Sequence, residues 1–328
     1  MTRPSERLSL IADIGGTNAR FALCAPDAAA RDEIVLACND FAGPAEAASA
    51  YLDRTSPKGH PKVGAFAVAS PVTGDTIDMT NHPWTFSVET VREQLGFETL
   101  QIINDFSAIA LAIPHLGPND RRPVGTGRAE PDTPVAVLGP GTGLGVSGLV
   151  PCGGDWHVLA TEGGHVTMAP FTDRESAILT VLRQNGHVSA EHVISGPGLV
   201  NLYRAICVLE GRPPEPGITP ETVTERGERS KRSGEFKVCR EALDTFCAML
   251  GTVAADLCLS LGARGGVYIA GGIVPKLGKT FTDSHFRTRF QTKGRFSDYL
   301  NAVPTFVITH PLPAFVGLAA LLRKSSAL

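Results

Sequence analysis

Apolar runs of strand length alternate with segments of helical periodicity along most of this chain. Near its start, LSLIAD, ARFALCA and EIVLACN are separated by a Gly-Gly-Thr turn and a polar turn, a pattern typical of paired strands. Further along, the spacing predicts helices over 44–54, 88–95, 174–184, 198–209 and 235–261, and strands over 63–69 and 101–105. Such an alternation predicts a layered α/β fold.

The second half of the chain repeats the opening pattern. VAVLGPGTGLGVSGLV, residues 135–150, again reads as strand, glycine turn and strand, which suggests two related halves. The strand GGVYIAGG, the strand FVITH and the helix FVGLAALLR follow near the end. The stretch 117–134 is expected to be a loop rich in Pro and charge, and 210–234, rich in Pro, Gly and charge, is expected to be an exposed connection.

Length and charge narrow the class of protein. At 328 residues, the chain exceeds most single hydrophobic cores, so two domains are expected. The net charge of -3 offers no basic surface to a nucleic acid or an anionic membrane. The first residues, MTRPSERLSL, lack an apolar signal core, and no run of roughly 18 uninterrupted apolar residues is present. A cytoplasmic protein without a membrane partner is expected.

The seven cysteines contain no C-x-x-C pair, which argues against a disulfide framework or a zinc knuckle. We expect them to be buried thiols.

Two glycine turns are candidate phosphate-binding loops. Backbone N–H groups of a tight turn reach phosphate oxygens only where no Cβ intrudes. The turns in question are Gly15-Gly16-Thr17-Asn18 and GPGTG, which includes Gly141, Thr142 and Gly143. The alternative is that both are ordinary hairpin turns.

Two other nucleotide motifs bear on the same question. No G-x-x-x-x-G-K-[ST] occurs, so a P-loop is not expected. A literal G-x-G-x-x-G spans 143–148, with Glu162 near the place of a ribose-binding acid, so an NAD-dependent dehydrogenase is an alternative function. That fingerprint must open a helix, whereas here it continues into VSGLV and Pro151, a strand-like run.

Two acids lie where strands end. Asp13 precedes the first glycine turn, where it would either cap the turn or hold a Mg2+ ion through water. Asp105 ends the run QIIND and precedes an apolar helix, so it is either an N-cap or a general base. Phosphoryl transfer to an alcohol needs one carboxylate to take the hydroxyl proton and a metal to neutralise phosphate charge.

Hydrogen-bonding side chains gather around two further glycine turns. TEGGHVTMAP contains Glu162 and His165, and VSAEHVISGPG contains Glu191. Carboxylates and a histidine on rigid turns suit adjacent sugar hydroxyls. A structural histidine is the alternative for His165, and the absence of H-E-x-x-H argues against a zinc site.

Taken together, these motifs resemble the bacterial glucokinases of the hexokinase and actin-like ATPase superfamily. The resemblance spans nearly the whole chain, through DIGGTN-ARFAL, IINDFSAIALAIP, LGPGTGLGVSGLV, TEGGHV-x-MAP, SAEHVISGPGLVNLYRAI, GGVYIAGGIVPK and KGRFSDYL. It implies a two-lobed actin-like ATPase (ribonuclease H-like) fold, in which each lobe is a mixed sheet flanked by helices and a sugar and ATP cleft lies between the lobes. We expect a small domain of 1–115 plus 312–328 and a large domain of 116–311.

The resemblance also implies the chemistry: transfer of the γ-phosphate of ATP, with Mg2+, to the 6-hydroxyl group of glucose by a homodimer. Asp105 would be the general base and Asp13 the magnesium residue. The other implied roles are sugar binding by Asn81, Asn104, Asp105, Glu162, His165 and Glu191, and ATP binding by Asp13, Gly15, Gly16, Thr17, Asn18, Gly141, Thr142, Gly143, Gly271 and Gly272.

Two departures from related families are informative. Related repressors and sugar kinases usually carry a C-x-C-G-x-x-G-C zinc cluster after their E-x-x-H motif, whereas VTMAPFTDRES follows His165 here, so no structural zinc is expected. A DNA-binding helix-turn-helix, which related repressors carry at the N-terminus, is not expected here, since the first strand begins at about Leu8. A sugar sensor without enzymatic activity is the second alternative function.

Overall fold

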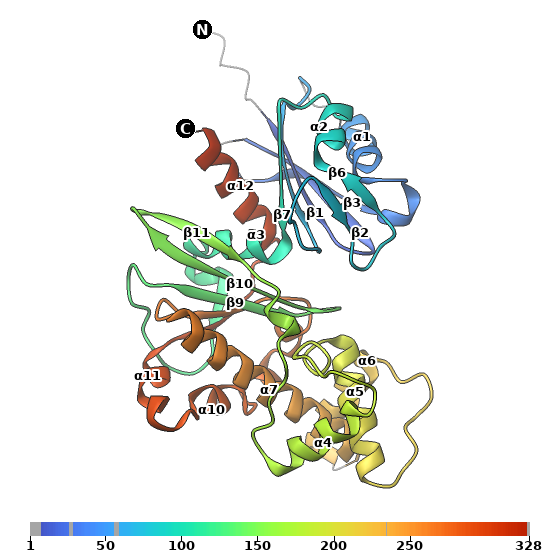
Figure 1. Ribbon diagram of the computed structural model, residues 1–328, viewed down its shortest axis with the longest axis vertical. Helices are drawn as coiled ribbons and strands as arrows, with labels where there is room; N and C mark the ends of the chain where they lie inside the picture. The colour runs from blue at the N-terminus through green and yellow to red at the C-terminus, as the bar shows by residue number, and fades with distance from the viewer. Residues whose placement is uncertain (1–7, 26–28, 56–58, 234, 327–328) are drawn as a thin grey trace. The chain divides into compact units, whose positions relative to one another are not determined.

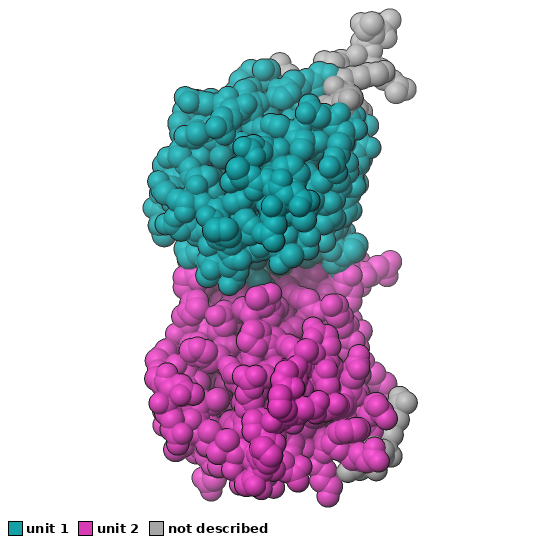
Figure 2. Space-filling view, turned by 90° about the vertical axis from the view of Figure 1, so that its right-hand side faces the viewer, with its two compact units in different colours: residues 1–117, 310–328 teal, residues 118–309 magenta. Residues whose placement is uncertain are grey.

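The computed structural model describes residues 8–25, 29–55, 59–233 and 235–326. The chain divides into two compact units, which Figure 2 colours separately: unit 1 is Met1–Gly117 with His310–Leu328, and unit 2 is Pro118–Thr309. The domain boundaries expected from the sequence, after 115 and before 312, stay predictions.

Unit 1 is built on a five-stranded mixed sheet in the order β3-β2-β1-β4-β7 (Figure 1). The three N-terminal strands form the predicted antiparallel meander, and β4 and β7 then extend the sheet in parallel with β1. A separate hairpin pairs β5 with β6. The strands are β1 (Ser9–Ile14), β2 (Asn18–Cys24), β3 (Arg31–Ala37), β4 (Val63–Val68), β5 (Thr76–Asp78), β6 (Thr85–Ser87) and β7 (Thr99–Asn104).

Four α-helices cover this sheet: α1 (Pro44–Thr55), α2 (Val88–Gln94), α3 (Asp105–Ala112) and α12 (Pro313–Ser326). The apolar face of α1 packs with Leu10 and Phe66 in one core cluster. Helices α3 and α12 lie side by side (Figure 1). A Cβ added at Gly317 of α12 would overlap the carbonyl oxygen of Ala108 in α3, so the two helix backbones are in direct contact. Only glycine permits that approach, which fixes the position of α3.

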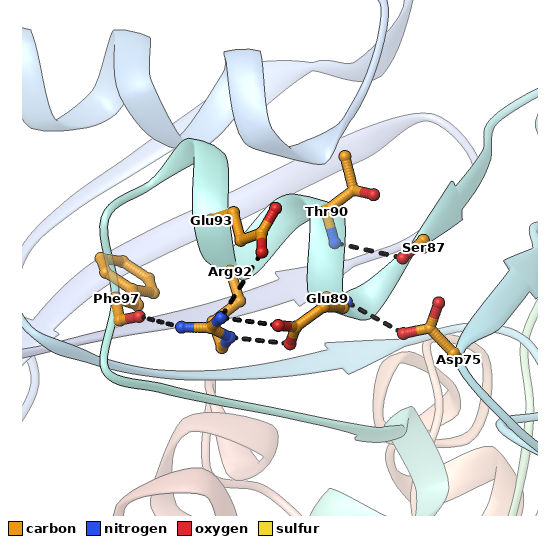
Figure 3. A network of polar contacts seen from close by, with 7 residues as sticks. All are labelled: Asp75, Ser87, Glu89, Thr90, Arg92, Glu93 and Phe97. Atoms are coloured by element: carbon orange, nitrogen blue, oxygen red, sulfur yellow. Dashed lines mark hydrogen bonds and ion pairs between the residues drawn. The ribbon is translucent and has the colours of Figure 1, made fainter.

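A polar network holds α2 in place (Figure 3). Ser87 is the N-cap, and its side chain accepts a hydrogen bond from the N–H of Thr90 (3.1 Å). Arg92 donates to both carboxylate oxygens of Glu89, at 2.7 and 2.6 Å, and to the carbonyl of Phe97 (2.8 Å). The helix is therefore capped at its start and tied at its end to the connection that leads to β7.

Unit 2 contains a six-stranded sheet in the order β11-β10-β9-β12-β13-β8. Its strands are β8 (Arg121–Pro123), β9 (Val135–Pro140), β10 (Leu144–Cys152), β11 (Asp155–Ala160), β12 (Val267–Ile269) and β13 (Thr305–Ile308). Strand β8 lies within 117–134, which the sequence predicted to be a loop throughout; that prediction is corrected here. Its three residues pair with β13, and so short a run carries no periodicity to detect.

The two sheets share one plan, as the repeated sequence pattern suggested. Five strands of each sheet show two antiparallel and then two parallel pairings in the same order, so that β9, β10, β11, β12 and β13 correspond to β1, β2, β3, β4 and β7. Strand β8 adds a third antiparallel pairing in unit 2. The segment G-x-G-x-x-G at 143–148 lies at the start of β10, not at the start of a helix. The structural context of a dinucleotide fingerprint is therefore absent.

Helices α5, α6 and α10 of unit 2 pack on α7, which is buried over most of its length. By length and composition, α7 is the one helix among the described residues that could cross a membrane, but 72% of its apolar window is buried inside the protein, as in a core helix. The helices are α4 (Asp173–Arg183), α5 (Gly196–Leu209), α6 (Pro220–Ser233), α7 (Lys237–Leu261), α8 (Val274–Leu277), α9 (Lys279–Thr282), α10 (Phe286–Gln291) and α11 (Ser297–Ala302).

Helix α6 corrects the prediction that 210–234 is an exposed connection. Val223, Gly227 and Ser230 form a narrow buried stripe that packs on α7. A Cβ at Gly227 would lie 2.9 Å from the carbonyl oxygen of Cys239, so the helices approach closely. Two of the three buried positions are a glycine and a serine, which explains why the charged sequence showed no apolar periodicity.

The prediction of buried thiols holds for six of the seven cysteines. Cys152, at the end of β10, is exposed and corrects it, because the strand has run past the core by that point.

Candidate functional site

The carboxyl ends of three parallel strands bring polar side chains of unit 1 together. β1, β4 and β7 run in the same direction and end at Ile14, Val68 and Asn104. Ligands of open α/β sheets bind at this edge. Asp13, Asn104 and Asp105 all lie there.

Asn104 caps helix α3. Its Oδ1 atom accepts hydrogen bonds from the N–H groups of Phe106 (2.9 Å) and Ser107 (3.2 Å). The N-cap alternative for Asp105 is therefore wrong, since Asp105 is the first residue of the helix itself. Asn104 Nδ2 also donates to Asp105 Oδ1 (3.0 Å), which orients that carboxylate.

Burial raises the pKa of Asp105 to about 7, and the negative charge of Asp13 adds to the rise. Hydrogen bonds from Phe106 and Asn104 oppose it only in part. A carboxyl group with this pKa exchanges its proton near neutral pH, as a general base must. Asp105 thus has the electrostatic setting of a catalytic acid–base group.

Asp13 faces Arg20 across the first hairpin. The two residues are paired in register, and Arg20 Nη1 lies 3.4 Å from Asp13 Oδ2. Burial raises the pKa of Asp13, and the positive charge of Arg20 opposes that rise. The Asp13 side chain keeps 30% of its surface exposed, so a carboxylate oxygen remains accessible.

This setting fits a magnesium ion. Among the described residues, no three His, Cys, Asp or Glu side chains are placed to hold a metal ion together. Mg2+ commonly takes one or two carboxylates, water and substrate phosphates instead of a full protein cage. Asp13 is a single, partly exposed carboxylate beside a glycine turn, which matches this mode of binding.

The first glycine turn leaves two backbone donors free. The N–H of Gly15 donates to the carbonyl of Asn18 (3.0 Å), which closes the turn. The N–H groups of Gly16 and Thr17 donate to no group within the part of the chain that the structure describes. Adjacent free N–H groups in a tight turn form an anion-binding concavity.

Asn81 lies directly against this turn. A Cβ at Gly16 would meet the Asn81 carbonyl oxygen at 2.7 Å, which explains why glycine stands there. The buried hydroxyl of Ser70, just beyond β4, accepts from the N–H of Thr80 (2.7 Å) and holds the Asn81 segment in place. The Asn81 side chain is exposed.

The second glycine turn, in unit 2, is held by a carboxylate. Glu191 Oε2 accepts a hydrogen bond from the N–H of Leu144 (2.7 Å). The N–H of Gly196 donates to the carbonyl of Gly141 (2.8 Å). Thr142, between these anchored positions, is exposed. One oxygen of Glu191 therefore supports the turn, a role that the sequence did not reveal.

Two segments that carry predicted sugar-binding residues run side by side in unit 2. The N–H of Glu191 donates to the carbonyl of Gly164 (2.9 Å), and Thr167 forms a β-bridge with Ser189. Glu162 and His165 are exposed, and within the described residues neither side chain makes a hydrogen bond or ion pair. Unpaired polar side chains on an anchored turn are available to a ligand.

Gly271 and Gly272 follow β12. Gly271 has φ +81°, and a Cβ there would overlap the carbonyl of Pro140. The 270–273 turn thus lies against the end of β9, beside the second glycine turn. Gly272 is exposed.

The sequence alone missed several supporting residues. Arg20 and Ser70 could have been suspected only after the strand register was known. Glu175 forms a buried ion pair with Arg289 (2.8 Å) and accepts from the N–H of Phe171 (2.7 Å), which anchors the chain after His165. Thr172 with Glu175 forms a capping pattern for α4, a signal present in the sequence.

Comparison with known proteins identifies the family. A family model described as Glucokinase matches residues 10–325. The glucokinase of Paramagnetospirillum magneticum is 54% identical over 318 residues, covering 96% of this chain and 98% of that protein. A glucokinase structure from an Antarctic psychrotroph has a TM-score of 0.85 at 37% identity, and the match covers 97% of this chain and 99% of that one.

A ROK family glucokinase from Streptomyces griseus, solved in complex with glucose and AMPPNP, shares the fold with a TM-score of 0.63 at 19% identity over 97% of this chain and 99% of that one. The predicted fold class, the mixed-sheet α/β fold of the actin-like ATPase superfamily, is confirmed. Since the family model and a relative of high identity each span nearly its whole length, the chain belongs to the glucokinase family.

Proposed function

We propose that this chain transfers the γ-phosphate of ATP to the 6-hydroxyl group of glucose, with Asp105 as the general base, giving glucose 6-phosphate and ADP. Membership of the glucokinase family makes the chain an ATP-dependent hexose kinase. The observation that carries the residue assignment is the Asp105 carboxylate, oriented by Asn104 at the carboxyl edge of the sheet with a pKa raised to about 7. The dehydrogenase alternative is not supported.

The role of Asp105 follows from what phosphoryl transfer requires. The hydroxyl oxygen must lose its proton as it attacks the γ-phosphorus, and a carboxylate can accept that proton. Asp105 lies in the first turn of α3, where the helix dipole favours a negative charge, while burial and Asp13 favour its proton. These opposing influences leave a base that is ionised above neutral pH.

The sugar would be held by the side chains of Asn81, Asn104, Glu162, His165 and Glu191. Support comes from their chemistry: carboxylates accept from sugar hydroxyl groups, and amides donate as well as accept. Glu162, His165 and Asn81 are exposed, and Glu191 keeps one carboxylate oxygen that is not used by the turn.

The phosphates of ATP would be bound by the free N–H groups of Gly16 and Thr17, with Gly15 and Asn18 completing the turn, and by Gly141, Thr142 and Gly143. Gly271 and Gly272 would lie near the adenosine. The neighbour that holds AMPPNP and glucose lends support to this pair of ligands.

Asp13 is the residue that would hold Mg2+, through water, beside the phosphates. When bound, the ion would neutralise charge that develops on the phosphate oxygens. Arg20, 3.4 Å from Asp13, orients the carboxylate, and its positive charge opposes the rise in the Asp13 pKa that burial causes.

The proposal also includes a cytoplasmic homodimer without a nucleic-acid or membrane partner. A net charge of -3 supports the absence of both partners, because nucleic acids and anionic membranes are negatively charged and would not be attracted strongly. Sedimentation of the purified protein would measure the oligomeric state, and a monomer would overturn that part.

A product assay tests the function. Purified protein is mixed with glucose, ATP and Mg2+, and glucose 6-phosphate is measured; we expect it to form in a ratio of one to each ADP. Binding of glucose without product would favour a sugar sensor, and reduction of NAD with an alcohol substrate would favour a dehydrogenase. Either result would contradict the proposal.

A further inference from the structure

Cys38 lies directly under the first glycine turn. It is fully buried and begins the 3-10 turn Cys38–Asp40 that follows β3. Its N–H donates to the carbonyl of Thr17 (2.9 Å), and its Sγ donates to the carbonyl of Gly15 (3.4 Å). One residue, distant in sequence, therefore holds two of the four residues of the turn.

The direction of these bonds matters for anion binding. A peptide group whose carbonyl points inward presents the following N–H outward. Gly15 and Thr17 direct their carbonyls toward Cys38, and the N–H groups of Gly16 and Thr17 have no partner among the described residues. The bond from the Cys38 thiol to the carbonyl of Gly15 thus fixes the peptide group whose N–H, on Gly16, is left free. The bond from the Cys38 N–H to the carbonyl of Thr17 holds the other end of the turn.

The 3-10 turn is itself anchored to the segment that carries Asn81. Asn39 Oδ1 bonds to His82 Nε2 (3.1 Å), and Trp84 Nε1 donates to the carbonyl of Phe41 (3.1 Å). The Trp84 side chain is buried, so this attachment is firm. Since Gly16 packs on Asn81, the glycine turn, the 3-10 turn and the Asn81 segment form one connected support.

We propose that Cys38 is a positioning residue for the phosphoryl donor: it holds the Gly15–Asn18 turn open for the phosphates of ATP. This inference rests on the proposed function, and it assigns to Cys38 no contact with substrate. Burial raises the pKa of the Cys38 thiol, so the group keeps the proton that it donates. Neither cysteine chemistry nor metal binding is involved.

Steady-state kinetics with ATP varied at saturating glucose, and with glucose varied at saturating ATP, tests the role. Loss of one hydrogen bond in Cys38→Ala should raise the KM for ATP about three- to tenfold, with the KM for glucose changed less than about twofold. Cys38→Ser keeps a donor and should recover most of the loss. Calorimetric titration with AMPPNP and Mg2+ should show the same order of affinities without turnover.

Cys24→Ala is the matched control. Cys24 is buried at the end of β2 opposite to the turn, so its replacement removes the same side chain from the same unit without touching the turn. We expect its KM for ATP to equal that of the wild type. Three results would overturn the inference: an unchanged KM for ATP in Cys38→Ala, an equal rise of that KM in Cys24→Ala, or no recovery in Cys38→Ser.

Should Cys38→Ala fail to fold, Asn39→Ala tests the same support. The Asn39 side chain is exposed, so folding should be spared, and loss of its bond to His82 should raise the KM for ATP about twofold. No change would count against the inference. A wild-type protein that forms no glucose 6-phosphate would instead refute the proposed function, so the two failures are distinguishable.

Discussion

The two units carry the same sheet plan but support their glycine turns in different ways. In unit 1, Cys38 supports the turn after β1 by donating hydrogen bonds to the carbonyls of Gly15 and Thr17. In unit 2, the turn after β9 is held by the Glu191 carboxylate through the N–H of Leu144. The first arrangement leaves backbone donors free, whereas the second places a fixed negative charge beside the turn.

The corresponding strand ends differ as well. The residue before the last of β1 is Asp13, and the residue in the same place on β9 is Gly139. A Cβ at Gly139 would lie 2.5 Å from the carbonyl carbon of Ala270, so no acid fits there. A shared fold therefore does not imply a shared role: in our account, unit 1 supplies the acids of the reaction and unit 2 mainly supplies binding groups.

Substitution of a turn glycine by alanine should reveal the largest difference in stability between the two units. A Cβ at Gly143 would lie 2.5 Å from Glu191 Oε2, whereas the nearest atom to a Cβ at Gly15 is 3.7 Å away. We expect Gly143→Ala to lower the free energy of unfolding by about 1–3 kcal/mol, because the displaced carboxylate loses its hydrogen bond from the N–H of Leu144. Gly15→Ala should cost less than about 1 kcal/mol. Urea denaturation measures both, and equal losses would contradict the difference in support.

Removal of the charge of Glu162, a proposed sugar-binding residue in unit 2, should have the next largest effect. Glu162→Gln should raise the KM for glucose about 10- to 100-fold, because a charged hydrogen bond is lost, and should leave the KM for ATP nearly unchanged. Glu228→Gln, on α6, is the control and should alter neither value. A change confined to the KM for ATP would move Glu162 out of the sugar site.

The raised pKa of Asp105 predicts a pH-dependent stability. Its folded pKa of about 7 exceeds the ordinary value of 3.8, so the ionised carboxylate destabilises the fold and stability falls as pH rises from 4 to 7. Asp105→Asn should therefore be more stable than the wild type at pH 8, by about 1–3 kcal/mol, with the gain absent at pH 4.

Thermal unfolding at the two pH values checks this gain. Asp78→Asn is the matched control, since Asp78 is an exposed acid of the same unit. A gain of the same size at pH 4, or in the control, would show that burial of the Asp105 charge is not its source.

The smallest expected effect is that of Glu191, which supports the second glycine turn and is also a proposed sugar-binding residue. Glu191→Gln keeps an oxygen acceptor for Leu144 but loses the charge, so we expect the KM values for glucose and ATP both to rise about threefold. A rise in the KM for glucose alone would show that the support of the turn does not depend on the charge of Glu191.

The sequence predicted most of the helices and strands and the positions of the two glycine turns. Strand alternation, helical periodicity and the two glycine turns are local patterns, and β1, β2, β4, α1 and α7 lie where these patterns indicate. Helix α6 was missed because its buried face consists largely of small side chains. Strand β8 was missed because three residues show no period.

The supports of the candidate site could not be predicted in the same way. Cys38, Arg20 and Ser70 act through contacts with residues that are brought near by strand pairing, so no local motif marks them. The sequence did not show which of Asn104 and Asp105 caps α3, since either residue type suits the start of a helix. The extended backbone of Asn104 and its hydrogen bonds to Phe106 and Ser107, which only the fold supplies, distinguish the two.

The most direct test of the account is single-turnover formation of glucose 6-phosphate by the wild type and by Asp105→Asn at pH 8, with glucose binding followed by calorimetry. We predict that the variant binds glucose with an affinity near that of the wild type but forms product about 10²- to 10⁴-fold more slowly. A variant that forms product at the wild-type rate would contradict the assignment of Asp105 as the general base.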